Sequence, residues 1–155
     1  MKDNKHTAAR IVMTVLTVAA IAAIFYNSSL NADESTEQSS PLTELINQWL
    51  RSVGVSFTLT EGIVRKLAHF TEYSVLGAMM VTTVYLYTGR RGKTLCIALP
   101  AGVLVAICDE LIQLIPEGRS SEVRDVLIDS CGILFAAMIV MIFISLLENR
   151  RKVKQ

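Results

Sequence analysis

Four long runs of apolar residues constrain the fold of this chain more than any other feature. Each run is long enough to cross a bilayer, which takes about 20 residues of α-helix. Apolar residues make up 52% of the 155 positions and charged residues only 19%, a balance that argues against an ordinary soluble domain. The sequence therefore predicts an all-α, polytopic membrane protein: a four-transmembrane-helix bundle forming one domain over residues 1–155. The predicted transmembrane helices span about residues 11–30, 67–87, 95–115 and 126–147.

The first apolar run has an alternative interpretation as a cleaved signal peptide, because Lys2, Lys5 and Arg10 precede it. The segment Leu30–Ala32 offers only a weak cleavage site. A retained transmembrane helix is therefore the favoured interpretation.

Basic residues predict the orientation, since short cytoplasmic loops are enriched in lysine and arginine. Ten of the 15 basic residues fall before the first run, between the second and third, or after the fourth. We therefore expect a cell-membrane protein with both termini in the cytoplasm. The ten are Lys2, Lys5, Arg10, Arg90, Arg91, Lys93, Arg150, Arg151, Lys152 and Lys154.

The segment between the first two runs has two predicted parts. Residues 31–40, "NADESTEQSS", are polar and acidic and predict a loop. Ser40-Pro41 is typical of a helix start, and apolar residues then recur at helical spacing up to the predicted stop at Gly54. The sequence thus predicts a short extracytoplasmic amphipathic helix over about residues 41–53, lying on the membrane surface or packed on the bundle as a lid.

The three cysteines do not have metal-ligand spacing, and small buried thiols are the favoured interpretation. A disulfide between Cys108 and Cys131 is the alternative. The sequence contains no recognisable metal-binding motif, so no cofactor is expected; a divalent metal ion held by His69 and the neighbouring carboxylates is the alternative that stays open.

Polar residues gather at three helix ends that an antiparallel bundle brings to one side of the membrane. Three pairs at i, i+4 spacing each share a helix face: His69 with Tyr73, Asp109 with Gln113, and Asp125 with Asp129. Each face continues into the membrane through small residues, which let helices pack closely. We therefore expect one polar cluster over a tightly packed seam. The small residues are Gly77, Gly102, Ala106, Gly132 and Ala136.

Two interpretations of this cluster remain open. Ion pairs to Lys66, His69, Arg119 and Arg124 would staple the helices together, but polar contacts within membranes contribute only about 0.6 kcal/mol on average. Ionisable groups inside membranes are more often functional, and a histidine facing carboxylates is suited to binding or proton transfer. A functional site is the favoured hypothesis.

Three segments carry a resemblance to a known family. "FYNSSLNADESTEQSS", "RKLAHFTEYSVLGAMM" and "DELIQLIPEGRSSEVRDVLIDSCG" resemble, in order, motifs of VanZ-like membrane proteins. The chain departs from the family where Phe135 and Ala136 stand in a region that often holds a glycine. The positions that match the motifs are Lys66, His69, Glu72, Tyr73, Asp109, Glu110, Gln113, Arg119, Asp125, Asp129 and Gly132.

The resemblance implies a small multi-pass membrane protein of a family named for low-level resistance to the glycopeptide teicoplanin. We expect an extracytoplasmic polar pocket that binds, shields or modifies a cell-envelope component, such as a lipid-linked wall intermediate or an anionic lipid. Its partners would include the lipid bilayer and no nucleic acid. The alternative is an enzyme acting on a lipid-linked or phosphate-bearing substrate, with His69 as general acid/base, Asp109 or Asp129 as its orienting group, and Arg119 and Arg124 as an anion clamp. The remaining candidate binding residues are Lys66, Glu72, Tyr73, Glu110, Gln113 and Asp125.

Overall fold

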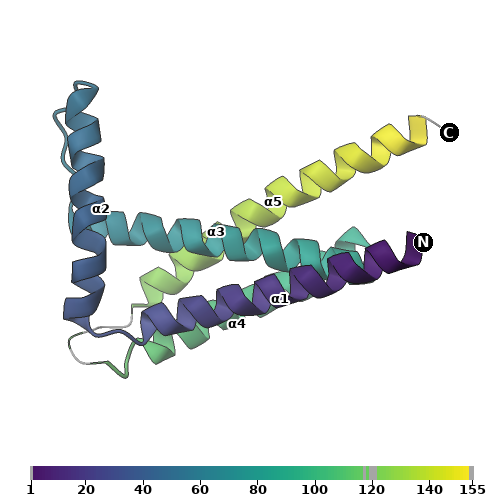
Figure 1. The fold of residues 1–155 in the computed structure, drawn as a ribbon, viewed down its shortest axis with the longest axis horizontal. Helices are drawn as coiled ribbons and strands as arrows, with labels where there is room; N and C mark the ends of the chain where they lie inside the picture. Colours follow the sequence, from purple (N-terminus) through teal and green to yellow (C-terminus); the bar gives the residue numbers. More distant parts are fainter. Residues whose placement is uncertain (1, 117, 119–121, 154–155) are drawn as a thin grey trace.

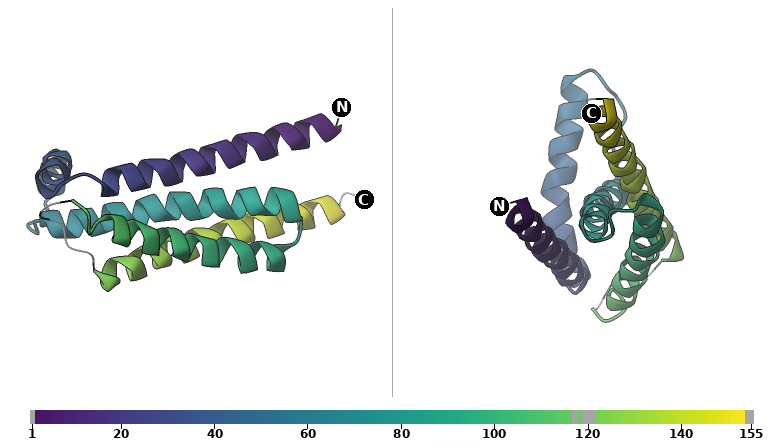
Figure 2. Two further views of the ribbon diagram at one scale, coloured as in Figure 1. Left: turned by 90° about the horizontal axis from the view of Figure 1, so that it is seen from below. Right: turned by 90° about the vertical axis from the view of Figure 1, so that its right-hand side faces the viewer.

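A computed structural model describes residues 2–116, 118 and 122–153, and within them it contains five α-helices. Four of them, α1, α3, α4 and α5, lie side by side and alternate in direction, and α2 lies across one end of this group (Figures 1 and 2). The start of α1 and the end of α5 lie at the other end (Figure 1). The helices are α1 (Lys2–Ser28), α2 (Ala32–Ser52), α3 (Glu61–Thr88), α4 (Arg91–Ile112) and α5 (Val123–Val153).

Three of these helices are long and apolar enough to cross a membrane, over His6–Ser28 in α1, Arg91–Ile112 in α4 and Val123–Arg150 in α5. They correspond to the first, third and fourth predicted spans, with ends shifted by a few residues. The second predicted span lies in α3. This helix is long enough to cross a membrane, but its mean hydropathy is too low for it to count among the apolar spans. Large apolar side chains cover the outside of the three helices, as a hydrocarbon environment favours. Examples are Val15, Leu104, Ile139 and Phe143.

Helix α3 is the centre of the bundle, since it contacts each of the other four helices. It begins where the Thr60 hydroxyl accepts a hydrogen bond from the Ile63 N–H, which caps the first turn of the helix. It ends at Gly89, whose φ of 58° is a left-handed conformation that glycine adopts without strain. Its buried side chains, including Tyr73, Leu76 and Val81, form much of the core.

The small residues predicted to form a close-packed seam are buried between helices. A Cβ added at Gly77 would lie 2.8 Å from the Cα of Ile133, and one added at Gly132 would lie 2.5 Å from the Phe70 carbonyl oxygen. Because both contacts are with backbone atoms, only glycine lets α3 and α5 approach this closely. Ala136 is buried too, so its place in a region where the family often has glycine is compatible with close packing.

The prediction for α2 was right about its end and wrong about its start. The helix ends at Ser52, and Gly54 follows with a φ of 82°, as the predicted stop requires. Residues 32–40, predicted as a loop, are helical instead, and Pro41 lies inside the helix.

The cysteines also differ from the prediction of buried thiols. All three are free, and Cys96 and Cys131 are exposed on the outer surface of α4 and α5, whereas Cys108 is half-buried. The exposure of Cys96 and Cys131 is explained by their place on helices that can cross a membrane, because a thiol is apolar enough to face lipid without a partner.

Candidate functional site

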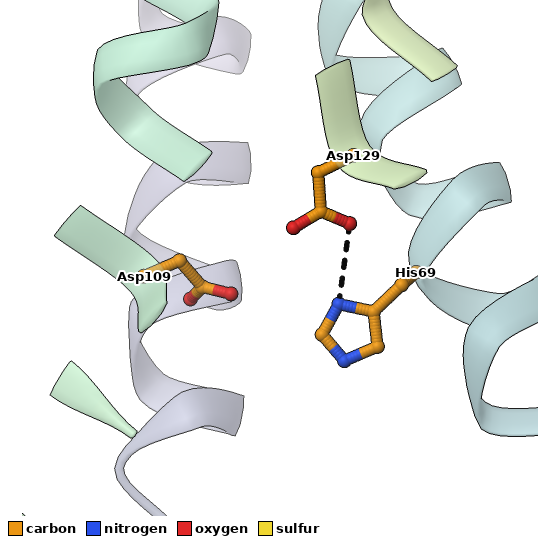
Figure 3. A group of neighbouring side chains, drawn as sticks. All are labelled: His69, Asp109 and Asp129. Atoms are coloured by element: carbon orange, nitrogen blue, oxygen red, sulfur yellow. Dashed lines mark ion pairs between the residues drawn. The ribbon is translucent and has the colours of Figure 1, made fainter. Parts of the chain in front are cut away.

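The ends of α3, α4 and α5 bring His69, Asp109 and Asp129 together, as the antiparallel helix order predicts. One ligand-type atom from each residue lies within 4.8 Å of the others. Figure 3 shows the imidazole and the two carboxylate groups pointing toward one another from three different helices. We call these three residues the His-Asp-Asp cluster.

Asp109 is held in place by α1 and by its own helix. Its side chain is completely buried. One carboxylate oxygen accepts a hydrogen bond from the Ser28 hydroxyl, and the other accepts one from the Gln113 amide at 3.2 Å. These contacts fix the orientation of the carboxylate and leave each oxygen with a lone pair for another partner.

Asp129 is also completely buried, but it is less well satisfied. Its Oδ1 lies 3.4 Å from His69 Nδ1, which is within ion-pair range. The contact does not have hydrogen-bond geometry, so neither Asp129 oxygen has a hydrogen-bond partner among the described residues. A buried carboxylate without such partners is strongly unfavourable, and this one sits on the packed α3–α5 seam.

Tyr73 and Glu110 add two further buried polar groups beside the cluster. Tyr73 is completely buried, as its predicted place in the polar cluster over the seam requires. Its hydroxyl has no hydrogen-bond partner among the described residues. One Glu110 oxygen accepts the Glu122 N–H at 2.9 Å, and the other is likewise without a partner there.

Lys66 neutralises the outer part of the site. Its ammonium group lies 3.1 Å from Asp125 Oδ1 and 3.4 Å from Glu122 Oε2. The hydrogen bond to Asp125 raises the pKa of Lys66 above its ordinary value of 10.5. Lys66 therefore stays charged at neutral pH, and it is committed to Asp125 and Glu122 and not to the His-Asp-Asp cluster.

The predicted anion clamp is not assembled in the described part of the chain. Arg119 lies outside the described residues. Arg124 is exposed at the start of α5, and no ion pair joins it to the cluster among the described residues. A charged guanidinium on a flexible side chain gains more from solvent than from a buried partner, which explains its outward position.

Glu72 lies on α3 and lines an apolar groove of about 460 Å³ between α2 and α3. Among the predicted binding residues it is the one on this groove, whereas Asp109 and Asp129 are enclosed by helices. The groove runs beside Ala68, the neighbour of His69, and His69 itself retains 14% side-chain exposure. The remaining lining residues are Leu42, Ile46, Val64, Leu67 and Thr71.

Ser28 is a site residue that the sequence reasoning missed. It is buried at the end of α1 and donates its hydroxyl hydrogen bond to Asp109. The available signal was its position within "FYNSSLN", the loosest of the three segments that carry the family resemblance. A single serine at a predicted helix end gave no reason to place it against a residue 81 positions away.

The chemical capacity of the cluster follows from its groups. One imidazole nitrogen and two carboxylate oxygens are a donor set suited to a divalent metal ion, and an imidazole facing a carboxylate is also suited to proton transfer. The fold and this cluster together define a helical membrane protein with a buried acidic site at one end of its bundle.

Comparison with family models gives the particular family. The chain matches the VanZ/LLP1 family over residues 13–144, most of its length, and it belongs to that family. The matched range includes all three residues of the cluster. No curated protein and no solved structure matches the chain.

Proposed function

We propose that this protein crosses the cell membrane four times, with both termini in the cytoplasm and the His-Asp-Asp cluster near the extracytoplasmic surface. The fourth span lies within α3 over about residues 67–87, which extend about 32 Å at the helical rise. Its contacts with all the other helices support this proposal, because a span shielded from lipid tolerates polar residues that lower its hydropathy.

The distribution of charge supports the orientation. The start of α1, the end of α5 and the α3–α4 connection lie at the same end of the bundle (Figure 1). Nine of the ten basic residues lie in or next to these segments, and Lys154 lies outside the described residues. Reporter fusions after Gln155 and within residues 90–93 should be active only in the cytoplasm, and one within residues 31–40 only outside. A cytoplasmic signal from residues 31–40 would reject the orientation.

At this extracytoplasmic end, we propose, the site binds and thereby shields or modifies a lipid-linked cell-envelope component, which lowers glycopeptide (teicoplanin) susceptibility. One observation carries the proposal: Asp129 is completely buried opposite His69, and its oxygens have no hydrogen-bond partner among the described residues. A helix staple would favour fully paired groups, whereas a binding site retains donors and acceptors for a ligand.

The groove between α2 and α3 supports a lipid-linked ligand. Its lining is mostly apolar, and it includes Ala68 and Glu72, which are close to His69 along α3. Helix α2 is held over the start of α3 by a 2.7 Å hydrogen bond from Ser40 to Glu61 and by two hydrogen bonds between the Asn47 side chain and Leu59. In this arrangement the groove binds the acyl or polyprenyl chain of the ligand, and the polar head group of the ligand reaches His69 and Glu72.

The alternative function is an enzyme acting on the same class of lipid-linked or phosphate-bearing substrate. The 3.4 Å separation between His69 Nδ1 and Asp129 Oδ1 favours this alternative, because a carboxylate at that nitrogen orients an imidazole for general acid/base catalysis. His69 would transfer the proton and Asp129 would position its ring. The exposed position of Arg124 leaves the anion clamp without described support.

Neutral variants test whether the cluster works as a site. Asp109→Asn, Asp129→Asn and His69→Gln should accumulate at near-normal levels and still lose the teicoplanin phenotype. Glu148→Gln, at the opposite end of the bundle, is the matched control and should retain it. Drug susceptibility and membrane abundance are measured on the same cultures. Variants that lose the phenotype only in proportion to their abundance would make the cluster a structural staple.

Mass spectrometry of envelope lipids separates shielding from catalysis. Cells with the wild-type protein, Asp129→Asn or no protein are compared under identical growth. Shielding predicts unchanged lipid-linked species with altered teicoplanin binding. A covalent change that requires Asp129 would favour the enzyme.

A further inference from the structure

We propose that His69, Asp109 and Asp129 bind one divalent transition-metal ion, for which Zn²⁺ is the best fit. The three residues supply a nitrogen and two oxygens, and these atoms lie within 4.8 Å of one another. Two ligands of a tetrahedral zinc ion, each about 2.1 Å from the metal, lie about 3.4 Å apart. The 3.4 Å between His69 Nδ1 and Asp129 Oδ1 has that spacing.

Charge balance favours a cation at this position. Asp109 and Asp129 are both completely buried, and Lys66 is already paired with Asp125 and Glu122. Two ionised carboxylates beside one imidazole leave excess negative charge even when the ring is protonated. A divalent ion bound to two carboxylates and a neutral imidazole gives a net charge of zero, which removes this unfavourable burial.

The surroundings of Asp109 are those of a supported metal ligand. Metal-binding carboxylates are typically hydrogen-bonded by residues behind them, which fixes their direction. Ser28, at the end of α1, and Gln113, directly after α4, donate to the two oxygens of Asp109. Asp129, in contrast, has no such partner among the described residues, so both its oxygens are available to a cation.

The donor set also indicates the kind of ion and of site. Imidazole favours Zn²⁺ and neighbouring transition ions over Ca²⁺ or Mg²⁺, which prefer oxygen ligands alone. Three protein ligands leave a fourth tetrahedral position, as in zinc sites that bind a water or a substrate oxygen. The ion reaches the cluster past His69, which is the partly exposed member.

This inference deepens the proposed function, and it rests on that function only for the role of the bound ion, which would be to hold an anionic head-group oxygen. Metal binding itself is measured without any envelope component. The full-length protein is purified in detergent with a histidine-free tag, in a background with Cys96→Ser and Cys131→Ser to remove the exposed thiols. It is stripped with chelator and titrated with ZnCl₂, and bound metal is counted by elemental analysis.

We expect one Zn²⁺ per chain, with Mg²⁺ and Ca²⁺ binding much more weakly. His69→Gln and Asp129→Asn should each weaken binding more than about 100-fold, beyond the range for an outer residue. Ser28→Ala should keep the stoichiometry and weaken binding about 10- to 100-fold, because it removes support from Asp109. Glu122→Gln, an exposed carboxylate nearby, should bind as the parent does.

Several outcomes would overturn the inference. Absence of stoichiometric Zn²⁺ from the folded parent protein rejects it without any variant. Retained binding in folded His69→Gln or Asp129→Asn would assign the ion to another place. Circular dichroism and thermal unfolding of the metal-free proteins establish folding, and Ser28→Ala carries the test if Asp129→Asn does not fold. A parent protein that binds no metal, with cluster variants that still lose the phenotype, would reject the metal and keep the proposed function. Metal binding that the cluster variants abolish without losing the phenotype would reject the function alone.

Discussion

Both ends of the bundle carry charged residues, but these residues differ in burial and pairing between the two ends. At the end with the termini, Arg91 pairs with Glu148 and Ser145, and the two charged side chains are 44% and 31% exposed. Arg10 donates to the Leu86 carbonyl at 2.9 Å and lies over the Tyr87 ring. At the other end, Asp109 and Asp129 are completely buried, and Asp129 has no hydrogen-bond partner among the described residues.

This difference distinguishes polar groups that connect helices from polar groups that belong to a functional site. Groups that only connect helices are paired and partly solvated, so their net contribution to stability is small. The cluster, in contrast, holds buried carboxylates. The described partners of Asp129 do not offset the free-energy cost of removing it from water. Retaining such a group is expected where its chemistry is used.

Glycine substitutions at the two ends should give the largest contrast. Gly132→Ala places a Cβ 2.5 Å from the Phe70 carbonyl oxygen, so α3 and α5 must separate. We expect unfolding in detergent to become easier by about 1–3 kcal/mol, the usual range for overpacking, together with loss of the phenotype. Gly92→Ala, near the start of α4, has nothing within 4 Å and should change stability little. Equal stabilities for the two variants would mean that the α3–α5 seam is not close-packed.

Neutralising one acid at each end sharpens the comparison. Asp129→Asn removes a buried, poorly paired charge, so the free energy of unfolding should stay the same or rise. Glu148→Gln weakens a partly exposed pair and should lower it by at most about 1 kcal/mol. Denaturant titration of both variants in one detergent gives the two values. A loss of about 3–5 kcal/mol for Asp129→Asn would show a structural ion pair and remove the distinction between the ends.

The smallest expected effect concerns Lys66, at the outer edge of the acidic end. Its hydrogen bond to Asp125 raises its pKa in the folded protein above 10.5. A raised pKa stabilises the folded state fully below 10.5, and the contribution is lost as pH rises through the folded-state value. Wild-type protein should therefore lose a small part of its thermal stability at strongly alkaline pH. Lys66→Met should lack that component, and identical pH profiles for the two proteins would contradict the pairing.

Much of the cluster could be predicted because it depends on connectivity. Antiparallel helices place the start of α3, the end of α4 and the start of α5 at one end, and i, i+4 spacing selects one face of each. His69, Asp109 and Asp129 met as expected for this reason. Ser28 was missed, since its position depends on how α1 rotates and packs against α3 and α4.

The sequence by itself determined the membrane character, the small-residue seam and the end of the bundle at which acidic residues gather. Apolar run length and periodicity are local properties, so they can be read without knowing the neighbours. The tertiary structure decided which charges are paired, because distance and burial arise only after helices pack. It assigned Lys66 to Asp125 and left Arg124 exposed. It also set His69 and Asp129 face to face near Gly132, where the α3 and α5 backbones approach closely.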